Sequence, residues 1–148
     1  MELRRRSRLR KPRARQCLED VAQVLSTMCS LIVIRTFAHR IAQTLAEHAS
    51  VPVINTLTDH SHPCQSFSDL DTLRRAGCDL DRLTVAWVGD GHSVLPSWPQ
   101  AATLFGFRLN VAVPDGFEPD GGLFIEAQRR SRGGVHRTRE RQAVAATK

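Results

Sequence analysis

The chain has 148 residues, with 21 Lys and Arg against 15 Asp and Glu, a formal net charge of +6, 41% hydrophobic residues and 5% aromatic residues. A chain of this length suits one ordinary domain and can bury a core. The sequence contains no run of about eighteen apolar residues, and no apolar segment follows its basic N-terminal stretch. These two features argue against a membrane span and a secretory signal.

The cysteines are scattered along the chain and form no Cys-x-x-Cys pair; they are Cys17, Cys29, Cys64 and Cys78. A chain with a core does not need disulfides, so we expect free thiols in a reducing, cytoplasmic compartment. His60, His62 and Cys64 alternate without a fourth partner, which is a weak zinc pattern. We therefore expect no metal ion.

The positive charge is concentrated at the two ends of the chain. Residues 1–15 carry a net +7 and residues 129–148 carry +6, which leaves −7 for the segment between them. Neither end contains aromatic residues for base stacking. We expect basic tails over 1–16 and 132–148, disordered at least over 1–15, and we expect no nucleic-acid partner. Non-specific anion or nucleic-acid binding through the arginines stays as the alternative function.

The first half of the chain predicts the order helix, strand, helix, strand. Apolar residues at helical spacing from Leu18 to Met28 indicate the first helix. The run Leu31-Ile32-Val33-Ile34 is typical of a strand buried on both faces, and it ends at Arg35. The predicted elements are a helix over 18–29, a strand over 31–34, a helix over 38–48 and a strand over 51–54.

The second half of the chain continues the alternation. His62-Pro63 predicts a helix start, because proline is favoured in the first turn, and Gly77 is a typical C-cap. The remaining predicted elements are a strand over 83–88, a helix that ends near Gly106, a strand over 109–113 and a helix over 122–131. Apolar strands separated by helices predict an α/β fold, with parallel sheets and helices on both faces.

Polar residues follow the predicted strands at their carboxyl ends. Arg35 ends the first strand, the segment 55–65 follows the second, and Gly89-Asp90-Gly91-His92-Ser93 follows the third. Ligands of parallel sheets bind at the carboxyl ends of the strands. We therefore expect Arg35, His62 and Gln65 to face one cleft there.

Five strings carry a family resemblance, and their order and spacing match as well: Val33-Ile34-Arg35-Thr36-Phe37, Ala49-Ser50-Val51-Pro52-Val53-Ile54-Asn55, Leu57-Thr58-Asp59, His62-Pro63-Cys64-Gln65 and Trp87-Val88-Gly89-Asp90-Gly91. With these strings the chain resembles ornithine carbamoyltransferases from about residue 18 to about residue 120. This stretch corresponds to less than half of the family's chain. The tetrapeptide at 62–65 is the specific signal.

The resemblance implies transfer of a carbamoyl group from carbamoyl phosphate to the δ-amine of L-ornithine, giving L-citrulline and phosphate in arginine biosynthesis. It implies Arg35 and His62 as catalytic donors to the carbonyl oxygen, where negative charge develops. Gln65 would hold the carbamoyl amide, with Pro63 and Cys64 in the same carbamoyl-phosphate element, and Ser93 would stand at the ornithine position. No cofactor is implied, and family members form trimers.

The resemblance also implies a division of the chain. Residues 17–65 correspond to the end of a carbamoyl-phosphate-binding domain, 66–82 to a connecting helix and linker, and 83–131 to the start of an ornithine-binding domain. Without the family context, Arg35 reads as a surface ion-pair partner and His62 as a helix N-cap.

The sequence departs from the family at several functional elements. It has no Ser-x-Arg-Thr-Arg phosphate loop before the first strand, no Asp-x-x-x-Ser-Met element and no His-Cys-Leu-Pro element. Ser93 replaces the asparagine that contacts ornithine. Pro96 and Pro99 fall where the family begins a helix, which predicts a late or distorted start. We therefore expect a truncated copy that is inactive as an isolated chain.

Overall fold

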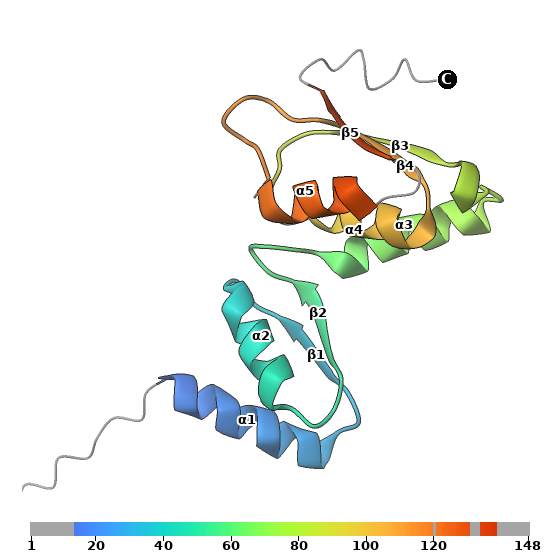
Figure 1. Ribbon diagram of the computed structural model, residues 1–148. Helices are drawn as coiled ribbons and strands as arrows, with labels where there is room; N and C mark the ends of the chain where they lie inside the picture. The colour runs from blue at the N-terminus through green and yellow to red at the C-terminus, as the bar shows by residue number, and fades with distance from the viewer. Residues whose placement is uncertain (1–13, 120, 131–133, 139–148) are drawn as a thin grey trace, which may run out of the picture.

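The computed structural model describes residues 14–119, 121–130 and 134–138, which form two parallel sheets (Figure 1). The first sheet pairs β1 (Ile32–Arg35) with β2 (Val53–Leu57). The second has the order β3 (Thr84–Val88), β4 (Arg108–Ala112), β5 (Val135–Thr138). The predicted N-terminal tail over 1–16 lies outside the described residues as far as residue 13, whereas Ala14, Arg15 and Gln16 begin the helix Ala14–Met28, so the predicted boundary is wrong there. Most of the C-terminal basic segment also lies outside the described residues.

Helices alternate with these strands, which confirms the predicted α/β class. They are α1 (Ala14–Met28), α2 (His39–His48), α3 (Pro63–Arg75), the 3-10 helix η1 (Leu80–Arg82), α4 (Ser97–Phe105) and α5 (Gly121–Arg130). Helix α1 packs on α2, and α3 contacts both β2 and α4. Helix α3 therefore connects the two sheets. None of the described helices is long and apolar enough to cross a membrane.

The first sheet is buried on one face. Ile32 is buried, whereas Val33 is 60% exposed and its register partner Ile54 is 41% exposed. Side chains alternate between the two faces of a strand, so Val33 and Ile54 lie on the same open face. The prediction that the run at 31–34 is buried on both faces is therefore wrong. In the described residues, helix packing shields the face that carries Ile32.

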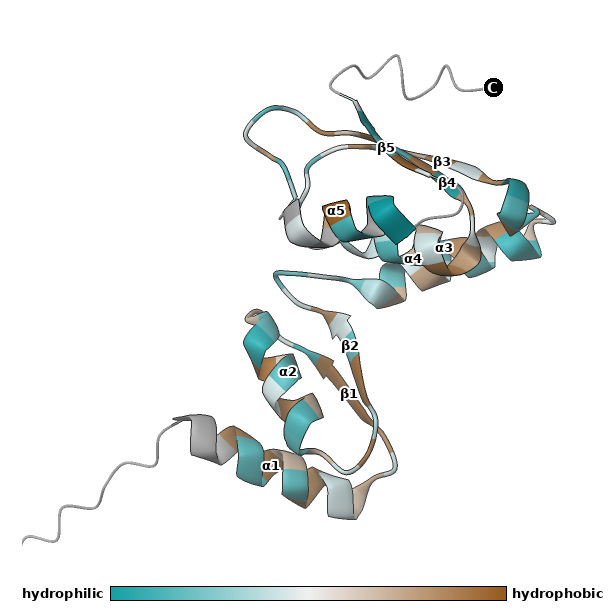
Figure 2. Cartoon of the chain, viewed as in Figure 1, coloured by the Kyte–Doolittle hydropathy of each residue, from teal (hydrophilic) through white to brown (hydrophobic). Residues whose placement is uncertain are grey.

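The second sheet holds the main core. Its central strand β4 buries Leu109 and Val111 completely, and Phe107 just before it meets Trp98 of α4 edge-to-face at a centroid distance of 6.0 Å. Helices α4 and α5 contact each other and lie on the same side of the sheet (Figure 1). Figure 2 shows hydrophobic residues, in brown, within this sheet and within the helices beside it.

Strand β5 lies inside the segment predicted as a basic tail from residue 132. Val135 is buried and pairs with Leu109, while His136 and Arg137 are exposed. A strand at the edge of a sheet can carry polar residues at most positions, because water solvates its free side. A single buried apolar residue gave too weak a pattern to predict this strand.

Helix α4 begins at Ser97, with Pro96 at its N-cap. Pro99 is therefore its third residue, within the first turn, where a backbone N–H has no partner in the helix. Both prolines are thus accommodated at the start of the helix. Its C-cap, Gly106, has a φ of 80°, the left-handed conformation that glycine adopts easily.

Candidate functional site

A pocket of about 510 Å³ lies at the carboxyl ends of β1 and β2. Each strand contributes its last residue and the two residues that follow it, and one further residue comes from the loop after β3. The lining consists of Arg35, Thr36, Phe37, Leu57, Thr58, Asp59 and Ser93. This is the edge of the sheet where ligands of parallel α/β proteins bind.

Arg35 is directed to the pocket by an irregularity in the sheet. The register shifts between Ile34, which pairs with Asn55, and Arg35, which pairs with Leu57. Such bulges redirect side chains and occur often next to functional sites. Arg35 is exposed and forms no ion pair with any of the described residues. Its guanidinium group is therefore available to an anion, with up to five N–H donors.

Thr58 organises the opposite wall of the pocket. It is 1% exposed, and its hydroxyl oxygen accepts hydrogen bonds from the backbone N–H groups of His60 (3.3 Å) and Ser61 (3.2 Å). Its own N–H donates to the carbonyl oxygen of Ser61 at 2.9 Å. These contacts close a tight turn directly after β2. The turn keeps the wall of the pocket compact.

Ser93 brings the second sheet's loop to the pocket of the first sheet. Its φ is 29°, in the left-handed region that residues other than glycine adopt rarely. The segment just before Ser93 is fixed by a backbone hydrogen bond, in which the N–H of Gly91 donates to the carbonyl oxygen of Phe117 at 2.8 Å. Through Ser93, the loop after β3 of the second sheet therefore contributes to a pocket formed mainly by the first sheet.

His62 and Gln65 use their polar groups within helix α3. His62 is the N-cap of α3, and its Nδ1 accepts a hydrogen bond from the backbone N–H of Gln65 at 3.3 Å. The Gln65 side chain donates from Nε2 to Asp69 Oδ1 at 2.8 Å. Among the described residues, the lining of the pocket includes Arg35 but neither His62 nor Gln65. The structure does not bring these three side chains together around that pocket.

Pro63 and Cys64 shape the start of α3. Pro63 is its first residue, where a missing N–H costs nothing. Cys64 is half-buried, and its Sγ lies 3.6 Å from the carbonyl oxygen of Asn55 in β2. Both residues therefore contact neighbouring backbone or helix rather than the lining of the pocket.

His39 lies beside the pocket, and its pKa is shifted from the usual value of a histidine. Partial burial lowers its pKa, the nearby His60 lowers it further, and Asp59 opposes the shift. The two imidazole rings lie with centroids 4.8 Å apart. In the part of the chain that the structure describes, no group of three or more His, Cys, Asp or Glu side chains could hold a metal ion.

The sequence predicts Arg35 and Ser93 as site residues but indicates no role for Thr36, Phe37, Thr58 and Asp59. Position was the signal that could have found them, because each follows the carboxyl end of a strand within two residues. Their residue types alone are common in turns.

The fold and the pocket together define a parallel α/β protein with a polar site at its strand ends. The family model described as aspartate/ornithine carbamoyltransferase, carbamoyl-P binding domain, matches residues 2–75. This match covers half of the chain, so the chain belongs to the aspartate/ornithine carbamoyltransferase family. The assignment agrees with the resemblance found in the sequence.

Comparisons with individual proteins support the same family. The chain is 49% identical to an ornithine carbamoyltransferase of Psychrobacter arcticus over 106 residues, which are 72% of this chain and 34% of that protein. The ornithine carbamoyltransferase structure from Gloeobacter violaceus matches with a TM-score of 0.80 and 37% identity, over 86% of this chain and 46% of that one. The ornithine carbamoyltransferase structure from Thermus thermophilus matches with a TM-score of 0.75 and 39% identity, over 91% of this chain and 43% of that one. The chain spans about a third of the length of curated relatives such as the one from Psychrobacter arcticus.

Proposed function

We propose that this chain binds carbamoyl phosphate at the Arg35 pocket and does not form citrulline as an isolated chain. The observation that carries the proposal is the unpaired, exposed guanidinium group of Arg35 in a pocket at the carboxyl ends of β1 and β2. The family assignment supports carbamoyl phosphate as the anion. L-ornithine is the proposed second substrate of the complete reaction, in arginine biosynthesis.

The chemistry of carbamoyl transfer requires hydrogen-bond donors at the carbonyl oxygen. Attack by the neutral δ-amine places negative charge on that oxygen, and fixed donors stabilise the charge. Arg35 would supply such donors. His62 is suited to supply another, because the Nδ1 atom that accepts from Gln65 carries no proton in the neutral ring, so the proton is on Nε2. The N-cap contact would thus fix the tautomer of a donor rather than exclude that role.

Gln65 and Ser93 are proposed to contact the carbamoyl amide and ornithine, respectively. For Gln65 this requires its amide to leave Asp69, which it reaches at 2.8 Å. Ser93 has a shorter side chain than the asparagine of the family, which supports weak ornithine binding. Pro63 and Cys64 would keep the start of α3 in place.

The charge of the pocket supports weak phosphate binding and no turnover. Its lining contains two charged side chains, Arg35 and Asp59, and their formal charges cancel. Phosphate is the leaving group and is a dianion, so its departure needs more cationic groups than this lining provides. Removing one donor to a developing charge typically costs about 10² to 10³ in rate. The given sequence does not contain the donors of the family's Ser-x-Arg-Thr-Arg and His-Cys-Leu-Pro elements.

The division of the chain is part of the proposal. Residues 17–65 would belong to a carbamoyl-phosphate-binding domain and 83–131 to an ornithine-binding domain, with α3 and η1 between them. We further propose a cytoplasmic protein that assembles with other copies.

Two measurements on purified full chain test the proposal. Carbamoyl phosphate is titrated into wild type and Arg35→Ala, and citrulline formation is assayed at saturating carbamoyl phosphate and ornithine. We expect weak binding that Arg35→Ala weakens at least tenfold, and no measurable citrulline. Turnover comparable to an ordinary enzyme, abolished by Arg35→Ala, would contradict the inactive state. Equal binding by both chains would contradict the site.

A further inference from the structure

The two turns that build the pocket are joined by reciprocal hydrogen bonds. The N–H of Asp59, after β2, donates to the carbonyl oxygen of Phe37, after β1, at 2.8 Å. In return, the N–H of His39 donates to Oδ1 of Asp59 at 3.0 Å. Asp59 therefore holds the segment 37–39 through both its backbone and its carboxylate.

A second contact reinforces the same junction. His39 Nδ1 lies 3.0 Å from the hydroxyl oxygen of Thr58. Thr58 is buried and fixed by the turn at 58–61, so it is a rigid partner. His39 is thus attached to the wall of the pocket by its backbone N–H and by its ring.

The sheet by itself does not fix the segment that follows Arg35. The regular register ends at Ile34, and the last strand-type contact is the hydrogen bond from the N–H of Thr36 to the carbonyl oxygen of Leu57, at 3.1 Å. Phe37, the next residue, is 85% exposed, so burial of its side chain does not hold it. Beyond Thr36, the position of this wall depends on Asp59 and Thr58.

Asp59 is an unexpected residue for an anion pocket. Its carboxylate lines the same cavity as Arg35, and a negative charge there opposes a bound phosphate. We infer that Asp59 is a positioning residue: its carboxylate oxygen holds the turn after β1 so that Arg35 and Thr36 are placed for the anion. This inference rests on the proposed function of the pocket.

The two roles of Asp59 predict opposite effects of substitution. If Asp59 acts only as a charge, both Asp59→Ala and Asp59→Asn strengthen anion binding. If it positions the turn, Asp59→Ala weakens binding, because the N–H of His39 loses its acceptor. Asp59→Asn keeps an oxygen for this N–H while removing the charge. The asparagine variant should therefore bind at least as well as wild type.

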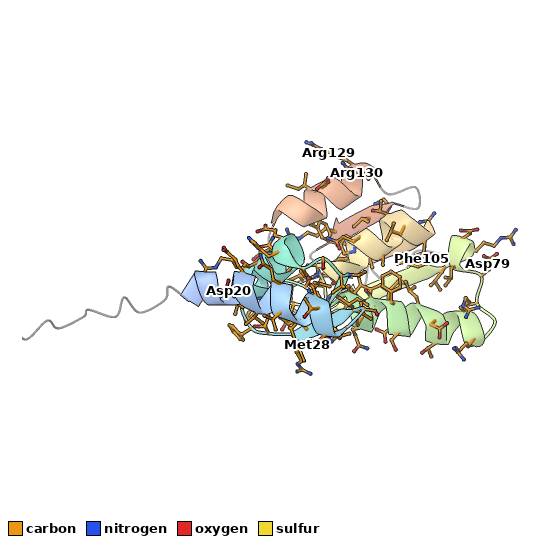
Figure 3. The ribbon with its side chains drawn as sticks, turned by 90° about the horizontal axis from the view of Figure 1, so that it is seen from below. Asp20, Met28, Asp79, Phe105, Arg129 and Arg130 are labelled. Atoms are coloured by element: carbon orange, nitrogen blue, oxygen red, sulfur yellow. The ribbon has the colours of Figure 1, made fainter. Side chains whose placement is uncertain are left out.

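The test is a titration of carbamoyl phosphate, and separately of inorganic phosphate, into the full chain, followed by NMR. The chains compared are wild type, Arg35→Ala, Asp59→Ala, Asp59→Asn and Asp79→Ala. Asp79 is the matched control, because it also caps a helix, accepting from the N–H of Asp81 at 3.1 Å. It lies at the end of the molecule away from α1 (Figure 3).

We expect Asp59→Ala to weaken binding about fivefold or more, which is the effect of losing roughly one hydrogen bond. Asp59→Asn should bind at least as tightly as wild type, and Asp79→Ala should lower the Tm without changing the dissociation constant. If Asp59→Ala binds as tightly as wild type or more tightly while Arg35→Ala loses binding, the inference is overturned and the proposed function stands. If wild type binds neither ligand, both fail.

Discussion

The backbone N–H of His62 donates a hydrogen bond to the hydroxyl oxygen of Ser97, with 2.9 Å between the two atoms. His62 precedes α3 and Ser97 is the first residue of α4, so this contact joins the loop after the first sheet to a helix of the second. Ser97 is 3% exposed. If the Ser97 hydroxyl is removed, water does not easily replace it as the acceptor for the N–H of His62.

We expect Ser97→Ala to lower the free energy of unfolding by about 1 to 3 kcal/mol, because the N–H of the half-buried His62 loses its acceptor. Ser68→Ala, at an exposed position of α3, is the control and should change it by less than about 0.5 kcal/mol. Urea unfolding at neutral pH measures both. Equal stability of the Ser97 variant and wild type would mean that this contact does not join the two parts.

The core of the second sheet gives a larger effect. Phe107 is fully buried and packs edge-to-face against Trp98. Phe107→Ala should cost about 3 to 5 kcal/mol, since it removes a large apolar side chain and leaves a cavity. Leu104→Ala, at a position that is 72% exposed, should cost little. Similar urea midpoints for these two variants would contradict the placement of the core.

Gly91 is placed where a side chain does not fit. A Cβ atom there would collide with backbone atoms of Pro119 and Phe117. Gly91→Ala should therefore displace the loop that carries Ser93 and destabilise the chain by about 1 to 3 kcal/mol. Gly122→Ala is the matched control, because a Cβ there meets nothing within 4 Å and alanine favours a helix. Thermal unfolding and the amide shift of Ser93 report the two effects, and an unchanged Tm in Gly91→Ala would refute the close approach.

The lowered pKa of His39 predicts how stability depends on pH. The unfolded chain takes up a proton at this residue near pH 6.5, whereas the folded chain binds the proton less readily, because of burial and the neighbouring His60. The free energy of unfolding therefore falls as the pH drops below about 6.5, until the folded pKa is passed.

The measurement compares urea unfolding at pH 7.5 and pH 5.5. Wild type should lose more stability over this interval than His39→Gln. His136→Gln, at an exposed position of β5, should lose as much as wild type. Identical losses for wild type and His39→Gln would show that His39 does not contribute to the pH dependence.

Periodicity in the sequence predicted the order of the elements from 18 to 131 because their apolar residues repeat at helical or strand spacing. It placed the end of the second strand at Ile54, whereas β2 continues to Leu57. Polar residues extend this strand, and the Thr56 hydroxyl donates to the carbonyl oxygen of Ile34 at 2.9 Å, which a hydropathy pattern does not encode. Strand β5 was missed for a related reason, since Val135 is its one buried apolar residue.

Arg35 was predictable as a site residue because it ends the first strand, where ligands of parallel sheets bind. Asp59 was not, because its role depends on the N–H of His39, twenty residues earlier in the chain. His62 also shows the difference, since the same residue reads as a helix cap from local sequence and as a donor from family context.

The location of bound carbamoyl phosphate distinguishes the Arg35 pocket from the basic C-terminal segment as the binding site. In a titration of ¹⁵N-labelled full chain, we predict that the amide shifts change around Arg35, Thr36, Thr58 and Ser93, and that Arg35→Ala abolishes these changes. Arg129 and Arg130 point outward from the end of α5, and these exposed cations are the alternative place for the anion to bind (Figure 3). Shifts confined to that end of α5, and unaffected by Arg35→Ala, would contradict the account and favour non-specific anion binding by the basic C-terminal segment.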